Sequence, residues 1–336
     1  MPEAEYLQMG GQAVIEGVMM RSPHYFAVAV RSPKGDVVVH HEPLEKTWIG
    51  RQAWLKWPFF RGSLALLDTM ALGARAMRYA AKVITDGEEE LKREAAKAAG
   101  ETLSGPTKSE QNQAKIQDVA IGGALVIGLA MGLFLFNYLP NLLAQPLERF
   151  GASEMLINLV VEIIKVTFFL GYLWGIGQLP DIKEVFRYHG AEHKAINAVE
   201  AGRPLNLDEV RAQTRLHPRC GTSFAIVVLI ISFIVFTFVP RYPFGAPKGW
   251  FIDASVRFLI ELVVLPLISG LAYEAIRWAG KMKNNKVVQG IFWPGLMSQY
   301  LTTRDPEDKH LEVAIASLQA VIDAEKVRAE GVAPSV

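Results

Sequence analysis

One run of 21 residues without a charged side chain, at positions 119–139, limits what this chain can fold into. As a helix it is long enough to cross the ~30 Å hydrocarbon core of a bilayer. Three further apolar runs follow at residues 155–179, 224–239 and 256–278. An uncharged helix of this length is rare in a soluble protein core. The pattern predicts an α-helical multi-pass membrane protein, with about four transmembrane helices within residues 119–280.

Basic residues are distributed unevenly between these runs. The connection at residues 181–221 contains seven of them: Lys183, Arg187, Lys194, Arg203, Arg211, Arg215 and Arg219. The segment after the fourth run adds Lys281, Lys283 and Lys286, whereas residues 141–154 contain only Arg149. The positive-inside rule therefore places both termini and the 181–221 loop in the cytoplasm. The N-terminus has no signal-peptide pattern, so insertion is expected to rely on the internal apolar segments. We expect a multi-pass protein of the inner cell membrane, with the lipid bilayer as its partner.

Residues 1–60 predict a small β-rich cytoplasmic domain. Short runs at residues 27–30 and 37–39 flank Ser32-Pro33-Lys34-Gly35-Asp36. Proline, glycine and aspartate between two such runs indicate a hairpin, because they supply a fixed φ, a permitted positive φ and side-chain capping. Residues 12–21 are expected to add one strand to the same sheet.

The segments that flank the predicted spans are helical or solvated. Residues 61–85 predict an amphipathic helix, since Asp68, Arg75 and Arg78 make it a poor span. It lies either on the membrane or in the cytoplasmic domain. Residues 86–118 predict a charged linker or a short solvated helix. Residues 281–336 predict a cytoplasmic C-terminal tail with an amphipathic helix, in which Leu311 and Leu318 share one stripe.

Composition excludes two classes of protein. The net charge is +1, so no overall basic field indicates nucleic acid as a partner. Cys220 is the single cysteine, which rules out an intrachain disulfide framework. Within the apolar runs, Glu162 with Lys165 and Arg257 with Glu261 have the spacing of intrahelical ion pairs.

The segment Tyr188-His189-Gly190-Ala191-Glu192-His193-Lys194 has the clearest potential for chemistry. On a helix, His189 and His193 are four residues apart and project from one face, so that both can reach one metal ion. Glu192 is close to the same face and could act as general base. H-x-x-E-H is the inverted form of a zinc-enzyme motif. Alternatively, these histidines are simply polar residues on a helix beside the membrane.

Three more residues could complete such a site. Glu200 continues the same helical face seven residues after His193, and His217 and Cys220 lie three apart before the third run. Carboxylate, imidazole and thiolate are all ligands of zinc. The expected cofactor is therefore a divalent metal, most simply Zn²⁺, held by His189 and His193 with Glu200, His217 or Cys220.

Several segments resemble the YqhQ-like family of bacterial membrane proteins (domain of unknown function 1385). They are residues 10–21, Arg61-Gly62, residues 188–194, residues 217–224 and the tail Pro294-Gly295-Leu296…Gln299…Leu301-Thr302-Thr303-Arg304. The resemblance covers most of the chain apart from residues 86–118. The resemblance implies a metal-dependent enzyme, but it assigns no substrate.

Three functions remain open at this point. The first is a metal-dependent membrane enzyme, a hydrolase in which Glu192 activates water. The second is a non-catalytic scaffold or assembly factor that binds membrane-protein partners. The third is a transporter or channel that uses carboxylates such as Glu162 or Glu261. The oligomeric state stays open as well.

Overall fold

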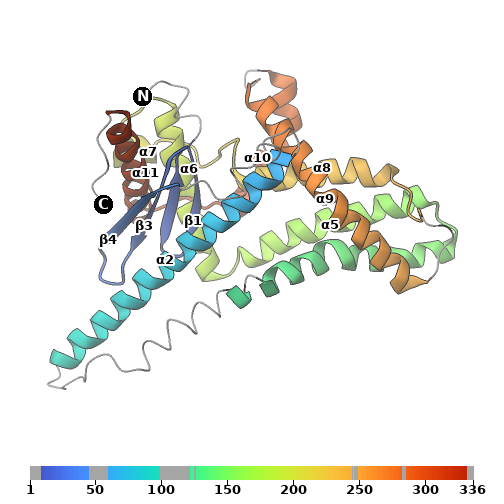
Figure 1. Ribbon diagram of the computed structural model, residues 1–336, viewed down its shortest axis with the longest axis horizontal. Helices are drawn as coiled ribbons and strands as arrows, with labels where there is room; N and C mark the ends of the chain where they lie inside the picture. Colours follow the sequence, from blue (N-terminus) through green and yellow to red (C-terminus); the bar gives the residue numbers. More distant parts are fainter. Residues whose placement is uncertain are drawn as a thin grey trace.

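Four N-terminal strands form one antiparallel sheet in the order β1-β2-β3-β4 (Figure 1). The strands are β1 (Gly10–Val14), β2 (Gly17–Arg21), β3 (Tyr25–Arg31) and β4 (Val37–Pro43). The computed structural model describes residues 9–44, 60–98, 122–124, 126–243, 245, 249–281 and 285–330. The other residues, including parts of the predicted N-terminal domain (1–8, 45–59) and of the predicted linker (99–118), lie outside this description.

The predicted hairpin and sheet are confirmed, with one difference. Strands β3 and β4 pair from Arg31↔Val37 outward, and Gly35 takes a φ of 98° in the connection. The single strand expected at residues 12–21 is instead two strands, β1 and β2, joined at Ile15 and Glu16. Glu16 has a φ of 51°, an unusual conformation for a residue with a Cβ atom, and a propensity argument does not place a turn there.

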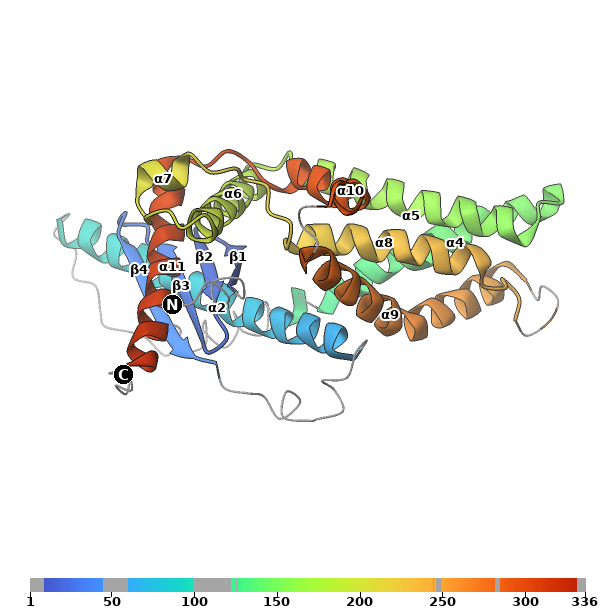
Figure 2. The same ribbon diagram turned by 90° about the horizontal axis from the view of Figure 1, so that it is seen from above.

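Alternation along the strands gives the sheet two buried faces. On one face, Val18, Met20, Ala27 and Ala29 pack against helices α6 (Pro180–Glu200), α7 (Leu207–Arg211) and α11 (Asp308–Ala329). On the other, Met19, Phe26, Val28 and Val30 pack against α2 (Phe60–Ala98). The result is a three-layer arrangement with the sheet in the middle (Figure 2).

Helix α11 differs from the predicted C-terminal tail, because it is an outer layer of the N-terminal domain. Leu311 and Leu318 are fully buried against the sheet, and the Ser317 hydroxyl donates to the Ala27 carbonyl at 3.1 Å. The predicted apolar stripe is therefore correct, and the sheet supplies its partner. The chain returns from the apolar helices to complete the core that the first strands began.

Helix α2 runs past the predicted boundary at residue 85 and ends at Ala98. Its charged second half pairs with the β3–β4 hairpin, where the Lys34 Nζ lies 2.8 Å from Glu90 and 2.9 Å from Glu94. At its other end, a Cβ on Gly62 would lie 2.7 Å from the Tyr273 Cβ, so α2 and α9 (Trp250–Lys281) are in close contact. Helix α2 thus connects the sheet to the apolar helices.

The remaining helices form an elongated bundle beside the sheet (Figures 1 and 2). Its elements are η3 (Phe134–Tyr138), α4 (Leu139–Ala144), η4 (Gln145–Phe150), α5 (Glu154–Ile176), α8 (Gly221–Phe238), α9 and α10 (Lys286–Thr302). In the described part of the chain, three helices are long and apolar enough to cross a membrane: Gly122–Phe150, α5 and α8, with hydropathy values of 1.8, 1.9 and 2.4. The fourth predicted span lies in α9, outside these three, and stays a prediction.

Charged groups are paired inside this bundle. Lys165 on α5 lies 2.8 Å from Glu162 and 2.8 Å from Glu261 of α9, and Arg257 lies 3.4 Å from Glu261. The two intrahelical pairs therefore form as predicted. The Asn141 amide of α4 also donates to Glu261 at 3.0 Å. A buried charge is tolerated only when it is paired and hydrogen-bonded, so this network fixes how α4, α5 and α9 pack together.

Candidate metal centre

Helix α6 presents the two histidines of the H-x-x-E-H segment on one face. The helix starts at Pro180, whose fixed φ suits the first helical position. The ring centroids of His189 and His193 lie 4.4 Å apart. Gly190 between them faces the Arg304 backbone, where a Cβ would collide with the carbonyl oxygen. This close approach explains a glycine in the middle of a helix.

Cys220 completes a group of three possible ligands. It is the N-cap residue of α8, and its Sγ lies 3.3 Å from His189 Nε2. The candidate ligand atoms of His189, His193 and Cys220 all lie within 4.8 Å of one another. Two imidazoles and a thiol form a donor set that suits zinc. The side chains present therefore fit a metal of this kind.

Backbone carbonyls determine how both imidazoles are oriented. His189 Nδ1 lies 2.8 Å from the Thr302 carbonyl oxygen, and His193 Nδ1 lies 2.6 Å from that of Arg215. Because a carbonyl only accepts, both Nδ1 atoms carry a proton, so that Nε2 is the nitrogen left to hold a lone pair in the neutral form of each ring. Burial lowers the pKa of His193, which keeps this imidazole neutral. Neutral, oriented imidazoles are what a metal site requires.

Glu192 lies beside the three candidate ligands. Its Oε2 is 4.0 Å from His189 Nε2, and the residue is only 5% exposed. Burial raises the pKa of this carboxyl, while the neighbouring imidazoles of His189 and His217 and a hydrogen bond from the Gly11 backbone N–H oppose the shift. Strand β1 passes so closely that a Cβ on Gly11 would lie 2.8 Å from the Glu192 Cγ. The N-terminal sheet therefore closes one side of the site.

His217 and Glu200, also predicted as possible ligands, form a separate pair. His217 Nε2 lies 3.4 Å from Glu200 Oε1, and Arg219 forms an ion pair with the same carboxylate. The His217 ring lies 5.7 Å from that of His193, between centroids. Burial lowers the pKa of His217. The structure therefore brings His189, His193 and Cys220 together, with His217 and Glu200 beside them.

Gln299 of α10 is a site residue that pattern reasoning missed. Its Oε1 accepts from the His217 N–H at 2.8 Å, and its Nε2 donates to the His217 carbonyl and to Ser223 Oγ, each at 2.7 Å. The residue is 0% exposed. Gln299 thus holds the turn that delivers Cys220 to the histidines. In the sequence, this residue stands out only because it belongs to the C-terminal segment that resembles the YqhQ-like family. No pattern of side chains indicates it, because its main partner is backbone.

Glu16 has a structural role here. The Tyr188 hydroxyl, one residue before His189, donates to Glu16 Oε2 at 3.1 Å. Burial and the charge of Glu16 raise the pKa of Tyr188, so the phenol keeps its proton. The strained β1–β2 turn is thereby tied to α6.

Comparison with known proteins places the chain in a family. The family described as "Protein of unknown function (DUF1385)" matches residues 57–324. The chain is also similar to the "Uncharacterized protein YqhQ" of Bacillus subtilis (strain 168), with 29% identity over 330 residues, which cover 97% of this chain and 96% of the relative. No solved structure matches. Because the family match covers most of the chain, this protein belongs to the DUF1385 family.

Proposed function

We propose that this protein is a metal-dependent membrane enzyme of the hydrolase type, with its site at the cytoplasmic end of the apolar helices. The observation that carries the proposal is the convergence of His189, His193 and Cys220 within 4.8 Å, with both Nδ1–H groups bonded to carbonyls. Helix α6 supplies the two histidines, and the turn before α8 supplies Cys220. Such preparation of the imidazole Nε2 atoms is typical of metal ligands.

The membrane location is supported by the apolar surface of the bundle. Three helices have the length and composition of spans. Large apolar side chains remain exposed on them and on α9, such as Val126 (69%), Phe238 (72%) and Val263 (78%). A soluble monomer rarely exposes apolar surface of this extent, whereas lipid would cover it. The basic 181–221 connection supports a cytoplasmic location for the site.

Each residue would have a distinct task. His189, His193 and Cys220 would hold the metal, and Thr302 and Arg215 would keep the two imidazoles in place. A divalent metal bound here would act as a Lewis acid and promote the ionisation of water. Glu192, whose Oε2 lies 4.0 Å from His189 Nε2, would act as the proton acceptor of the site. Strand β1 would exclude bulk water from the Glu192 side.

Metal analysis of the detergent-purified full chain tests the metal centre. We expect about one zinc per chain in the wild type and its loss in His189→Ala, His193→Ala and Cys220→Ser. His217→Ala is the matched control, because it removes a neighbouring buried imidazole outside the group of three. Metal-free wild-type protein that also fails to take up Zn²⁺ would disprove the proposal.

Hydrolysis is tested separately with a panel of para-nitrophenyl esters and phosphoesters. The zinc-loaded wild type should cleave a member of this panel. Glu192→Gln should retain the metal but lose activity by about 100-fold or more, since it removes the proton acceptor. Equal rates for the wild type and Glu192→Gln would show that Glu192 is not the proton acceptor.

A further inference from the structure

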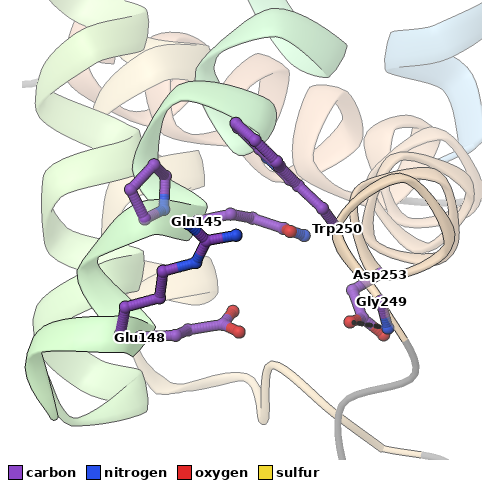
Figure 3. A pocket seen from close by; sticks show the side chains of 7 residues that line it. Gln145, Glu148, Gly249, Trp250 and Asp253 are labelled. Carbon is purple, nitrogen blue, oxygen red and sulfur yellow. Dashed lines mark hydrogen bonds between the residues drawn. The ribbon is translucent and has the colours of Figure 1, made fainter.

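A second polar site lies at the opposite end of the bundle from the candidate metal centre. A cavity of about 130 Å³ lies between η4 and the first turn of α9. Gln145 and Glu148 come from one side, and Trp250 and Asp253 from the other (Figure 3). Arg149 also lines it. No task of the proposed enzyme involves these residues.

The cavity contains a buried donor that has no hydrogen-bond partner among the described residues. Gln145 is only 5% exposed, and its Nε2 forms no hydrogen bond with any residue that the structure describes. A buried, unsatisfied N–H group is costly, and native proteins rarely keep one without a reason. The exposed guanidinium of Arg149 adds a positive charge nearby. Together these donors suit an anionic oxygen group.

The other residues of the cavity suit a cation. The Glu148 carboxylate accepts from the Tyr242 hydroxyl and lies 3.6 Å from Arg241 Nε, and Asp253 accepts from the Gly249 N–H at 2.9 Å. Asp253 contributes negative charge, whereas the charge of Glu148 is shared with Arg241. The Trp250 indole is anchored by its N–H to the Leu142 carbonyl at 2.8 Å and remains 44% exposed. An anchored indole face beside carboxylates attracts an ammonium group.

We propose that this cavity binds a zwitterionic phosphoamine, a molecule with a phosphate and an ammonium group, as in phosphoethanolamine. Gln145 and Arg149 bind the phosphate, and Trp250 with the carboxylates binds the ammonium. In the topology predicted from the basic residues, η4 and the start of α9 lie at the non-cytoplasmic surface of the inner membrane. Zwitterionic phospholipid head groups are abundant at such a surface. A lipid head group and a free phosphoamine share this chemistry.

Titration calorimetry of the detergent-purified full chain tests the proposal, with O-phosphoethanolamine, inorganic phosphate and ethanolamine as probes. Phosphoethanolamine should bind, and inorganic phosphate and ethanolamine should each bind at least about tenfold more weakly. Gln145→Leu and Arg149→Ala should each weaken phosphoethanolamine about tenfold or more, because each removes a donor to a charged oxygen. Arg277→Ala, an exposed arginine at the other end of α9, should change nothing.

Native mass spectrometry with equal amounts of phosphatidylethanolamine and phosphatidylglycerol identifies the source. Retention of phosphatidylethanolamine alone, lost in both variants, supports the site as a lipid site even if the soluble probe binds weakly. Preference for phosphatidylglycerol, or binding unchanged in both variants, overturns the proposal. So does the failure of the wild type to bind either the soluble probe or phosphatidylethanolamine. Gln145→Leu should melt no lower than the wild type, since it removes a buried donor that has no partner in the described part of the chain, and Arg149→Ala changes only an exposed side chain.

Discussion

A turn of irregular backbone carries the thiol of the candidate metal centre, and single side chains hold that turn in place. Gln299 contacts both the N–H and the carbonyl of His217, three residues before Cys220. Thr222 Oγ1, two residues after the cysteine, lies 3.2 Å from its Sγ. At the residue scale, the position of the thiol therefore depends on a side chain from a helix about 80 residues later in the chain.

Gln299→Leu should both destabilise the protein and weaken the metal site. The change keeps the bulk but leaves the buried His217 N–H without this partner, at a cost of about 1–3 kcal/mol. It also removes one hydrogen bond each from Ser223 Oγ and from the His217 carbonyl, which still accepts from the Cys220 N–H. We also expect about 10- to 100-fold weaker zinc binding, as is usual when a group that supports a ligand is removed. Thermal unfolding and chelator competition measure the two effects. Gln319→Leu, which removes only a solvent-exposed hydrogen bond to Asp323, is the control; an equal loss there would contradict the argument.

Gly190→Ala should destabilise the protein, contrary to helix propensity. Alanine normally stabilises a helix relative to glycine by about 0.5–1 kcal/mol. At Gly190, however, the new Cβ would meet the Arg304 carbonyl oxygen, so α6 and the residues after α10 would have to separate, at about 1–3 kcal/mol. Gly171→Ala in α5, where a Cβ would meet no atom within 4 Å, should show no such loss. Thermal unfolding of both variants decides between the two effects.

These residues show where sequence reasoning ends. The spacing of His189 and His193 predicts a shared face, because helix geometry is local. Which of Cys220 and Glu200 lies beside the two histidines depends on how the connection between α6 and α8 folds back. The pairing of His217 with Glu200 depends on the same connection. Gln299 and Gly190 act on backbone atoms of distant segments, and backbone groups leave no mark on a sequence pattern.

At the scale of elements, Glu184 links α6 to α11. It accepts from the Lys309 Nζ at 2.6 Å, from His310 Nε2 at 2.9 Å and from Arg187 at 3.0 Å. Partial burial alone would raise the pKa of Glu184, but these three partners outweigh it and lower the pKa to about 2. A carboxyl with a lowered pKa stabilises the fold above its ordinary pKa of 4.5, and this contribution is lost as the pH falls toward 2.

Glu184→Gln should therefore lower stability at pH 7 by on the order of 1–2 kcal/mol, a value that allows for solvent screening. The difference from the wild type should shrink at pH 3, where most of the wild-type advantage has been lost. Thermal unfolding at the two pH values measures it. Glu330→Gln, at the exposed end of α11, should track the wild type at both. A Glu184→Gln deficit that stays constant from pH 7 to pH 3 would show that the ionised carboxylate is not what links the helices.

Elements were easier to predict than their partners. The β3–β4 hairpin, the apolar helices and the stripe of α11 follow from local residue order and periodicity. The packing of α11 and α2 on opposite faces of one sheet does not follow from local order. An amphipathic stripe indicates that a helix packs against something, but not against which element. Local residue order likewise does not reveal that the continuation of α2 to Ala98 contacts the β3–β4 hairpin, where Lys34 pairs with Glu90 and Glu94.

At the scale of the whole molecule, the two proposed sites lie at opposite ends of the apolar bundle. The metal site belongs to the end that contacts the sheet, and the phosphoamine site to the end formed by η4 and the start of α9 (Figure 2). If the bundle crosses a membrane, these ends face different compartments. The basic connection 181–221 favours the cytoplasm for the metal site. The orientation of the chain therefore bears on both proposals.

Cysteine labelling of intact cells tests this orientation. In a Cys220→Ser background, which removes the single native thiol, one cysteine replaces Phe150 (83% exposed, end of η4) and another replaces the exposed Arg203 between α6 and α7. A membrane-impermeant maleimide should label Phe150→Cys in intact cells, but Arg203→Cys only after permeabilisation. Since charge flanking the spans sets the orientation, loss of the Cys220 thiol should leave it unchanged. Labelling of Arg203→Cys in intact cells would place the metal site outside and the phosphoamine site inside. Labelling of both positions without permeabilisation would show that the bundle does not separate two compartments.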